Sequence, residues 1–351
     1  MHNTFSRSSL AGLCGRRPGP LALLAALLQL PASGASAQVT TRGHIEFGGR
    51  QLFGDRGAAK FFEYRSIPEG LFLSSVNVDM DWGERGYFLG LRAEDALEGD
   101  QRMELRAGRQ GRYELTVEFD RVPHLFTTSG RSIFVESEPG VFTLPDSVQA
   151  KLRAIYSTDI DPKTTGVQRD VAALQAFIEG LARPADVSLL RERGRARLRF
   201  TPTPEWDIRL QYGAEKERGS RPFGATFGFN VQEQLEPIDY TTHEVQASVE
   251  RSGANWNVRA AYTASLFRNH VDALTWDNPF QEKDLLGASA RGRTDLYPDN
   301  GARLGSLSGG VRLPLQGWLT ASVGRGTSTQ DDLLLPFTIN SDQGSATVTA
   351  R

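Results

Sequence analysis

The stretch GRYELTVEFDRVPHLF, residues 111–126, indicates the fold class because its residues alternate in character. The apolar set is Tyr113, Leu115, Val117 and Phe119, and the set between them is Arg112, Glu114, Thr116, Glu118 and Asp120. A period of two places these two sets on opposite faces of a β-strand. The hydrated face of that strand belongs either to the outside of a soluble protein or to the inside of a barrel set in lipid.

The N-terminus predicts export. Residues 1–20 carry three arginines and no acidic residue, and the apolar run LALLAALLQL follows at 21–30. A small-x-small site then ends at Ala37. These are the parts of a secretory signal peptide, so we expect residues 1–37 to be removed. The apolar run is about half as long as the roughly 20 residues that a membrane-spanning helix needs, which argues against an anchor.

The alternation recurs along the rest of the chain, with short turn-like junctions between the runs. Further strands are expected near 42–53, 71–82, 84–96, 101–109, 195–215, 243–267 and 305–326. Tight turns are expected at 83–86, 98–100, 110–111, 202–204 and 252–253. Such junctions predict antiparallel neighbours in an up-and-down meander. About a dozen strands are expected, and residues 344–351 begin a strand without completing it.

A long insertion interrupts this pattern between 122 and 190, after Pro123 and His124, which we expect to end the strand. Within it, DVAALQAFIEGLA at 170–182 spaces its apolar residues as one face of a helix. Short turns on one side of a sheet and a long, partly helical loop on the other are typical of outer-membrane barrels. The alternative is a packing helix of a soluble α+β domain.

Strand length and aromatic placement favour the membrane. The expected strands reach or exceed the 9–11 residues of a tilted bilayer crossing, whereas strands of soluble proteins commonly have about 5–6. Aromatic residues near strand ends suit interface girdles: Trp82, Tyr87, Tyr113, Phe119, Trp206, Tyr212, Trp256 and Trp318. We therefore predict an all-β, antiparallel, up-and-down transmembrane β-barrel. Since an open sheet edge in lipid leaves backbone groups unpaired, residues 38–351 are expected to be the N-terminal part of a larger barrel.

This fold predicts which side chains face which medium. The lipid-facing candidates are Tyr113, Leu115, Val117, Phe119, Trp206, Ile208, Leu210 and Tyr212. The candidates for the lumen or its protein cargo are Arg112, Glu114, Glu118, Asp120, Arg197, Arg199, Asp207 and Arg209. Outer-membrane lipid is therefore an expected partner.

Catalytic and metal-binding patterns are lacking. The only cysteine, Cys14, lies in the predicted signal peptide, so the mature chain has no disulfide, no thiol nucleophile and no Cys-x-x-Cys-His for covalent haem. The five histidines show no metal-ligand spacing, and there is no GxSxG elbow or P-loop. Asp159 and Asp161 are better explained by a solvated turn than by a calcium site. We expect no enzyme and no cofactor bound by this chain, and the net charge of −2 argues against nucleic acid.

Five stretches resemble the MtrB/PioB family, the outer-membrane β-barrels associated with decahaem cytochromes. They are FGGRQLFGDRGAAKFFEYRSIPEGLFL (47–73), GRYELTVEFDRVPHLF (111–126), TPTPEWDIRLQYGAEKERGSRPFG (201–224), EPIDYTTHEVQASVE (236–250) and SLFRNHVDALTWDNPF (265–280). The resemblance implies a bacterial outer-membrane barrel near the upper end of the 8–26 strand range. Some members carry a Cys-x-x-Cys near the mature N-terminus, which this chain lacks, so no role of that pair is carried over.

What the resemblance implies about function is a sheath without a redox centre of its own. The barrel would hold a multihaem c-type cytochrome, and the partner's haem would conduct electrons across the outer membrane. A general diffusion porin with an open lumen is the alternative, and an outer-membrane enzyme such as a lipase is a third, for which no catalytic constellation is present.

Overall fold

The computed structural model describes residues 39–54, 58–163, 166–227, 230–283 and 289–331. The predicted signal peptide and the predicted strand at 344–351 lie outside these residues. Within the described ranges, no helix combines the length and the apolar character needed to cross a membrane.

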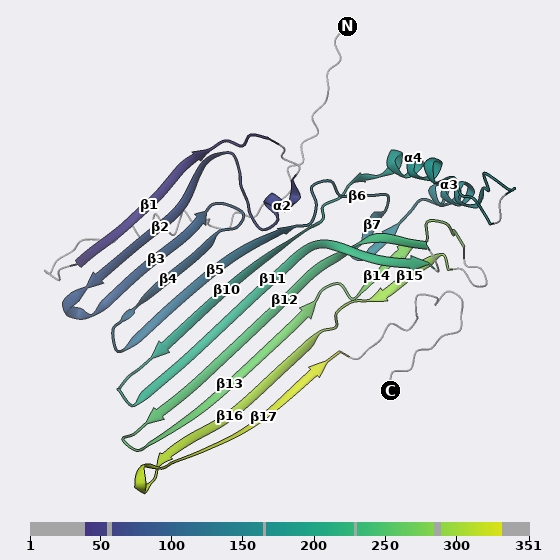
Figure 1. The fold of residues 1–351 in the computed structure, drawn as a ribbon. Helices are drawn as coiled ribbons and strands as arrows, with labels where there is room; N and C mark the ends of the chain where they lie inside the picture. The colour runs from purple at the N-terminus through teal and green to yellow at the C-terminus, as the bar shows by residue number, and fades with distance from the viewer. Residues whose placement is uncertain (1–38, 55–57, 164–165, 228–229, 284–288, 332–351) are drawn as a thin grey trace. The chain divides into compact units, whose positions relative to one another are not determined.

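One antiparallel sheet of eleven strands dominates the fold, and its strands are neighbours in the order in which the chain makes them (Figure 1). They are β1 (Val39–Arg50), β2 (Gly70–Trp82), β3 (Tyr87–Ala96), β4 (Arg102–Arg109), β5 (Tyr113–Leu125), β10 (Ser188–Phe200), β11 (Trp206–Phe227), β12 (Asn230–Ser252), β13 (Trp256–Asn269), β16 (Asn300–Arg312) and β17 (Trp318–Gln330). The predicted all-β meander is confirmed. In the part of the chain that is described, the sheet is open, with β1 and β17 at its edges.

The two ends of the strands differ. At one end, called the tight-turn end, five short connections join β2 to β3, β4 to β5, β10 to β11, β12 to β13 and β16 to β17 (Figure 1). The first uses the 3-10 turn Gly83–Arg85 and Gly86 at φ +67°, a left-handed conformation that glycine adopts without steric cost. The other end, the loop end, carries the longer connections, including the short helix α2 (Ala59–Phe62). The predicted turn at 98–100 exists but lies at the loop end, so short connections occur at both ends.

The long insertion is shorter in sequence than the predicted 122–190. β5 continues through Pro123 and His124 to Leu125, and β10 already begins at Ser188. The expectation that Pro123 ends the strand is wrong. The amides of Arg121 and Leu125 bond away from β10, to the carbonyls of Gln101 and Glu63. Pro123 lies between them on that same side, beyond the start of β4 at Arg102, so its missing N–H removes no bond of the β4–β5 ladder.

The insertion contains two helices where one was predicted. The predicted helix is confirmed as α4 (Val171–Leu181), and the carboxylate of Asp170 caps it by accepting a bond from the amide of Ala173 at 2.9 Å. The helix α3 (Asp146–Ser157) was not predicted. The short strands β6 (Arg131–Ser132), β7 (Val135–Glu138), β8 (Val141–Thr143) and β9 (Arg183–Pro184) complete the insertion.

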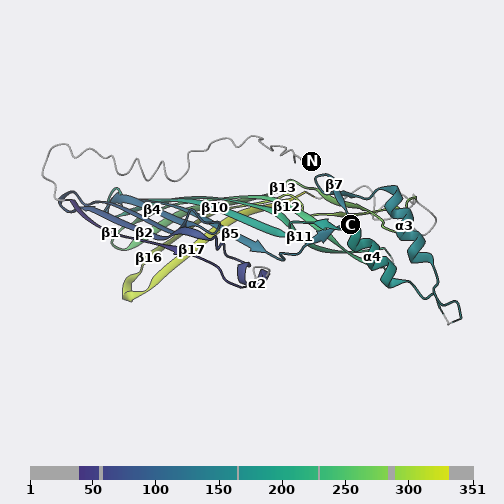
Figure 2. The same cartoon turned by 90° about the horizontal axis from the view of Figure 1, so that it is seen from above.

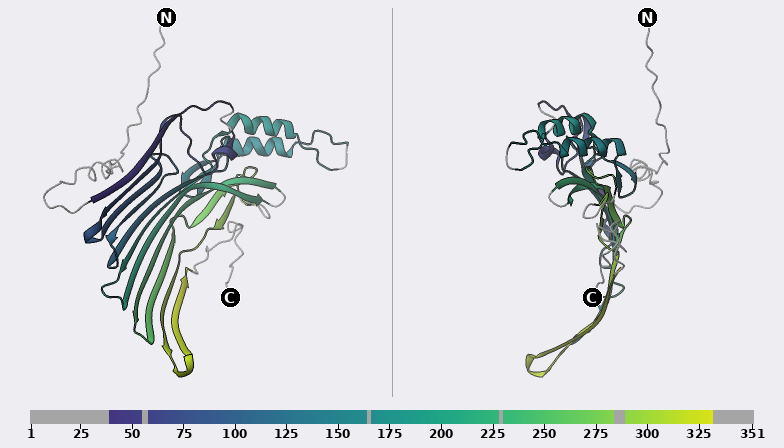
Figure 3. Two further views of the ribbon diagram at one scale, coloured as in Figure 1. Left: turned by 60° about the vertical axis from the view of Figure 1, so that its left-hand side comes forward. Right: turned by 90° about the vertical axis from the view of Figure 1, so that its right-hand side faces the viewer.

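A second sheet joins two connections that are far apart in the sequence. Its order is β15-β14-β8-β7, with β14 (Ala273–Asp277) and β15 (Arg291–Asp295) coming from the connection between β13 and β16. Parallel pairing of β14 with β8 places Trp276 beside Phe142. We call this sheet together with α3 and α4 the cap; Figures 2 and 3 show it at the loop end of the strands.

Candidate functional site

The strand register sorts the large sheet into two faces. Residues directly opposite each other in an antiparallel pair point to the same side, so a face can be followed from strand to strand. Leu115 lies opposite Leu198, Leu198 opposite Leu210, and Leu210 opposite Ala247. We call the side that carries these residues the belt face. It holds all eight lipid-facing candidates: Tyr113, Leu115, Val117, Phe119, Trp206, Ile208, Leu210 and Tyr212.

The opposite side, which we call the wall face, carries seven of the eight lumen candidates. They are Glu114, Glu118, Asp120, Arg197, Arg199, Asp207 and Arg209, and the register aligns them across β5, β10 and β11. Arg112 is on neither face, since it lies in the turn between β4 and β5 and its guanidinium donates to the carbonyl of Pro202 in the neighbouring turn. The sequence thus predicted the two groups, although alternation alone could not separate a turn residue from a strand residue.

Ion pairs cover the wall face, most of them between neighbouring strands. Asp207 accepts bonds from Arg199 at 2.9 Å and from Arg209 at 2.6 Å. Arg106 on β4 donates to Glu114 on β5 at 2.8 Å. Similar pairs join Glu118 to Arg195 and Arg197, and Arg193 to Glu215. Because these side chains are partly exposed, each pair adds at most about 1 kcal/mol, and the array acts mainly as a two-signed charged surface.

A hollow of about 740 Å³ lies against this charged array. Its lining contains six arginines from five strands: Arg92, Arg106, Arg197, Arg199, Arg209 and Arg259. Gln211 and Gln246 add amide groups. The site therefore offers many donors to a hydrated or protein surface. It shows no paired nucleophile and base.

The belt face has an aromatic edge at the tight-turn end. Trp82 lies opposite Tyr87, and Tyr113 opposite Phe200, each pair next to a turn. Trp206 and Trp256 begin β11 and β13 on the same face. Of the other predicted girdle residues, Phe119 and Tyr212 lie farther along their strands, and Trp318 is at this end but on the wall face, opposite Arg312. Aromatic rings at one level suit the membrane interface.

Charged residues bound the belt face at the loop end. Glu192 contacts Arg121 at 3.6 Å and Arg218 at 3.1 Å, and Lys216 pairs with Asp239. Along β11, the apolar positions of the belt face run from Trp206 to Ala214, a span of nine residues, before these charges begin. That span matches the 9–11 residues of a tilted membrane strand.

Beyond this charged boundary, β11 and β12 continue past their neighbours and meet the cap. β10 pairs with β11 only as far as Gly219. Farther along, the wall face becomes apolar: Phe223 and Phe227 pack on Trp276 with ring centroids 6.2 and 6.1 Å apart, and Trp276 is only 2% exposed. Trp276 and Asp277 end β14, and Trp276 belongs to the core of the cap.

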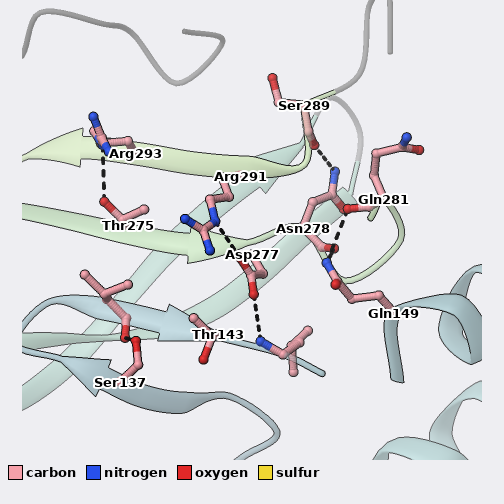
Figure 4. Close-up of polar contacts among 12 residues, drawn as sticks. Ser137, Thr143, Gln149, Thr275, Asp277, Asn278, Gln281, Ser289, Arg291 and Arg293 are labelled. Atoms are coloured by element: carbon pink, nitrogen blue, oxygen red, sulfur yellow. Dashed lines mark hydrogen bonds and ion pairs between the residues drawn. The ribbon is translucent and has the colours of Figure 1, made fainter. Parts of the chain in front are cut away.

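Polar side chains within the cap hold its two connections together (Figure 4). Asp277 accepts bonds from the amide of Leu144 at 2.8 Å and from Arg291 at 2.9 Å. Gln149 of α3 donates to the carbonyl of Asn278 at 2.8 Å. The bonds to Leu144 and from Gln149 join segments that lie more than 100 residues apart, so neither connection forms this structure alone.

An ion pair fixes the extended hairpin of β11 and β12 below the cap. Glu236, whose side chain is 5% exposed, accepts two bonds of 2.8 Å from Arg221. The hydrogen bonds to Glu236 raise the pKa of Arg221 and outweigh the opposing effect of burial.

Metal ligands do not cluster in the described ranges, where no three His, Cys, Asp or Glu side chains are placed to hold an ion. The carboxylate of Asp159 accepts bonds from the amides of Asp161 at 3.1 Å and Gln168 at 3.0 Å. The first bond is local to a turn, and the second crosses to the chain that returns beside it, where Asp159 and Arg169 form a β-bridge.

Comparison with known proteins places the chain in context. The model of the family described as "outer membrane beta-barrel porin, MtrB/PioB" matches residues 54–350. "Outer membrane protein MtrB" of Shewanella baltica (strain OS185) is 27% identical over 228 residues, which are 65% of this chain and 30% of the relative. The chain thus spans less than a third of that relative.

Among solved structures, OmpT of Vibrio cholerae aligns at a TM-score of 0.32 with 9% identity, over 82% of this chain and 67% of that chain. The toluene transporter TodX of Pseudomonas putida aligns at 0.23 with 10% identity, over 82% and 72%. At scores this low, neither structure bears on function.

Proposed function

Since the chain belongs to the MtrB/PioB family of outer membrane β-barrel proteins, we propose that it forms part of a barrel that holds a multihaem c-type cytochrome in the outer membrane. Electrons would cross the membrane along the haems of that partner. The family match over residues 54–350 is the observation that carries the proposal. The barrel itself would be a non-catalytic sheath.

The two faces of the sheet support a barrel that contacts lipid outside and a protein partner inside. The belt face, with its nine-residue apolar span on β11, would lie in hydrocarbon. The wall face would line the interior, where its two-signed array suits a protein surface better than a single ion, because complementary charges fix the register of a docked partner. The only cysteine of residues 1–351 is Cys14, so this sequence contains no Cys-x-x-Cys-His for covalent haem, and the proposal assigns the haem to a partner.

An open diffusion porin is the second candidate. The family description contains the word porin, and the hollow against the wall face is lined by hydrated arginine and glutamine side chains. A porin would leave this space filled with water. A sheath would fill it with protein.

Co-purification separates the two candidates. The full-length protein would carry an affinity tag, be extracted in detergent from the outer membranes of the cells that make it, and be resolved on a haem-stained gel. A sheath brings down a stoichiometric haem protein. Liposomes containing the purified assembly should reduce an enclosed redox dye only when the cytochrome is present. Absence of a haem protein, together with sugar flux through the reconstituted barrel alone, would establish the porin instead.

A further inference from the structure

An arginine on the belt face lies between two tryptophans at the tight-turn end. The guanidinium carbon of Arg251 is 5.1 Å from the ring centre of Trp206 and 5.8 Å from that of Trp256. The register places Arg251 opposite both Trp206 and Val258, on the side that carries the apolar belt. Cation–π contacts hold the guanidinium at the level of the aromatic edge.

This cation has an acidic neighbour in Glu205, which interacts with it electrostatically, but it forms no close ion pair with that carboxylate. Arg251 is exposed, and within the described residues no carboxylate lies within 4 Å of its guanidinium. The wall-face arginines Arg106, Arg199 and Arg209, in contrast, each bond a carboxylate. A charge without a close ion pair, on a face that meets lipid, is costly unless it reaches the headgroup layer. The position of Arg251, next to the turn that follows β12, gives it that reach.

An apolar groove of about 550 Å³ begins beside this arginine. Gly309 and Ala321 lie opposite each other, in the same register row as Val258, and their small size leaves a depression there. Belt-face side chains form the walls of the depression: Trp256, Val258, Leu307, Val311, Leu319 and Val323. The groove and the cation are therefore adjacent on one surface.

We propose that Arg251 and this groove bind one phospholipid, with the phosphate on the guanidinium and an acyl chain in the groove. Guanidinium binds phosphate through paired, charge-assisted hydrogen bonds. The short turns of outer-membrane barrels face the periplasm, where the leaflet consists of phospholipid. The proposal rests on the assignment of the belt face to lipid.

Arg109 provides a matched control. It is on the same face and at the same end, with its guanidinium 5.4 Å from the ring centre of Tyr87, but its Nε already donates to the carbonyl of Arg85 at 3.2 Å. Full-length protein would be delipidated and titrated with palmitoyl-oleoyl phosphatidylglycerol under native mass spectrometry. Arg251→Gln should weaken the tightest site about tenfold, as expected for loss of a charge-assisted bond, while Arg109→Gln should leave it unchanged.

A second variant tests the groove separately. Ala321→Leu fills the depression at an exposed position and leaves Arg251 intact, so it should also weaken the site. Equal affinities for Arg251→Gln and Arg109→Gln, or lipopolysaccharide as the molecule that co-purifies at this site, would overturn the proposal. The haem-stained gel tests the binding of a cytochrome independently of lipid. The sheath proposal and the phospholipid proposal can therefore fail separately.

Discussion

The part of β11 and β12 near the tight-turn end and the part near the cap both alternate apolar and polar residues, but their apolar residues point to opposite faces of the sheet. From Trp206 to Ala214, the apolar residues of β11 are on the belt face and the charged ones on the wall face. Beyond Ser220, the wall face carries Phe223 and Phe227, which pack on the cap. The apolar residues still recur at every second position, but they move from the belt face to the wall face. The phase therefore shows which side of a strand carries the apolar residues, and the inversion marks where the cap begins to cover the wall face.

Burial also differs between the two parts. Large belt-face residues such as Leu115 and Leu210 are 39% and 49% exposed in the isolated chain, because only lipid would cover them. In the cap, Leu274 and Trp276 are 0% and 2% exposed and are covered by protein alone. The cap should thus be stabilised by its own core, whereas the belt depends on the membrane.

The largest expected effect is in the cap. Trp276→Ala should lower the stability of the cap by about 3–5 kcal/mol, since it empties a fully packed site. Hydrogen exchange in β8 and β14 measures the loss. Trp318→Ala, at a site that is 59% exposed, is the control and should leave the cap unchanged. Equal exchange in both variants would show that the cap lacks a core of its own.

Next in size is a charge placed on the belt. Leu115→Arg should cost about 2–4 kcal/mol in a membrane-refolding assay if the belt face meets lipid at mid-depth. Glu114→Arg, one position away on the wall face, should cost far less. Comparable losses would reject the assignment of the two faces.

Two Arg–carboxylate interactions then compare the cap end with the wall. Glu236→Gln weakens the interaction with Arg221 at a site that is 5% exposed and should cost about 1.5–3 kcal/mol. Asp207→Asn, at 20% exposure, should cost less than about 1 kcal/mol. Denaturant titration of vesicle-inserted protein gives both values, and a reversed order would contradict the difference in burial.

The smallest effect is a pH dependence at Asp299, in the connection before β16. Burial alone would raise the pKa of this carboxyl. Bonds from Arg268 at 2.5 Å and from the amide of Asn269 at 2.8 Å have the opposite, larger effect, so the pKa of Asp299 is lower than usual. A depressed pKa means that the stabilisation is present above the unfolded value of about 3.9 and is lost as the pH falls through the folded value.

Local proteolysis of this connection should therefore be constant from pH 7 to pH 5 and rise only in stronger acid. Proteinase K covers pH 7 to pH 5 and pepsin covers lower pH, and each cleavage rate is divided by that of an unfolded substrate at the same pH. Asp299→Asn should remove the step, and an unchanged step in that variant would assign it to another group.

Much of the sheet could be predicted because its signals are local. The alternation from Tyr113 to Phe119 predicted which residues share a face of the sheet. Turn residues such as Gly86 predicted that consecutive strands are antiparallel neighbours. The helix α3 was missed although Val148, Leu152 and Ile155 recur at helical spacing, since the whole insertion was treated as a loop with one helix.

The cap could not be predicted from local patterns. Its strands are short: β8 has three residues and β14 has five. Asn278 and Pro279 after Trp276 are typical of a turn, and the residues that bury this tryptophan, Phe142, Phe223 and Phe227, are all distant in the sequence. The inversion along β11 was hidden by Pro222 and Gly224, which blur the alternation where its phase changes.

Parallel pairing of β8 with β14 also constrains the order of assembly. Phe142 and Trp276 meet across 134 residues of chain, so the entropy of closing that interval opposes their contact until the strands between them are already in place. Docking of the two connections should thus be a late event in biogenesis. Until then neither connection has its packed core, and afterwards the bonds made by Asp277 and Gln149 hold the two connections together.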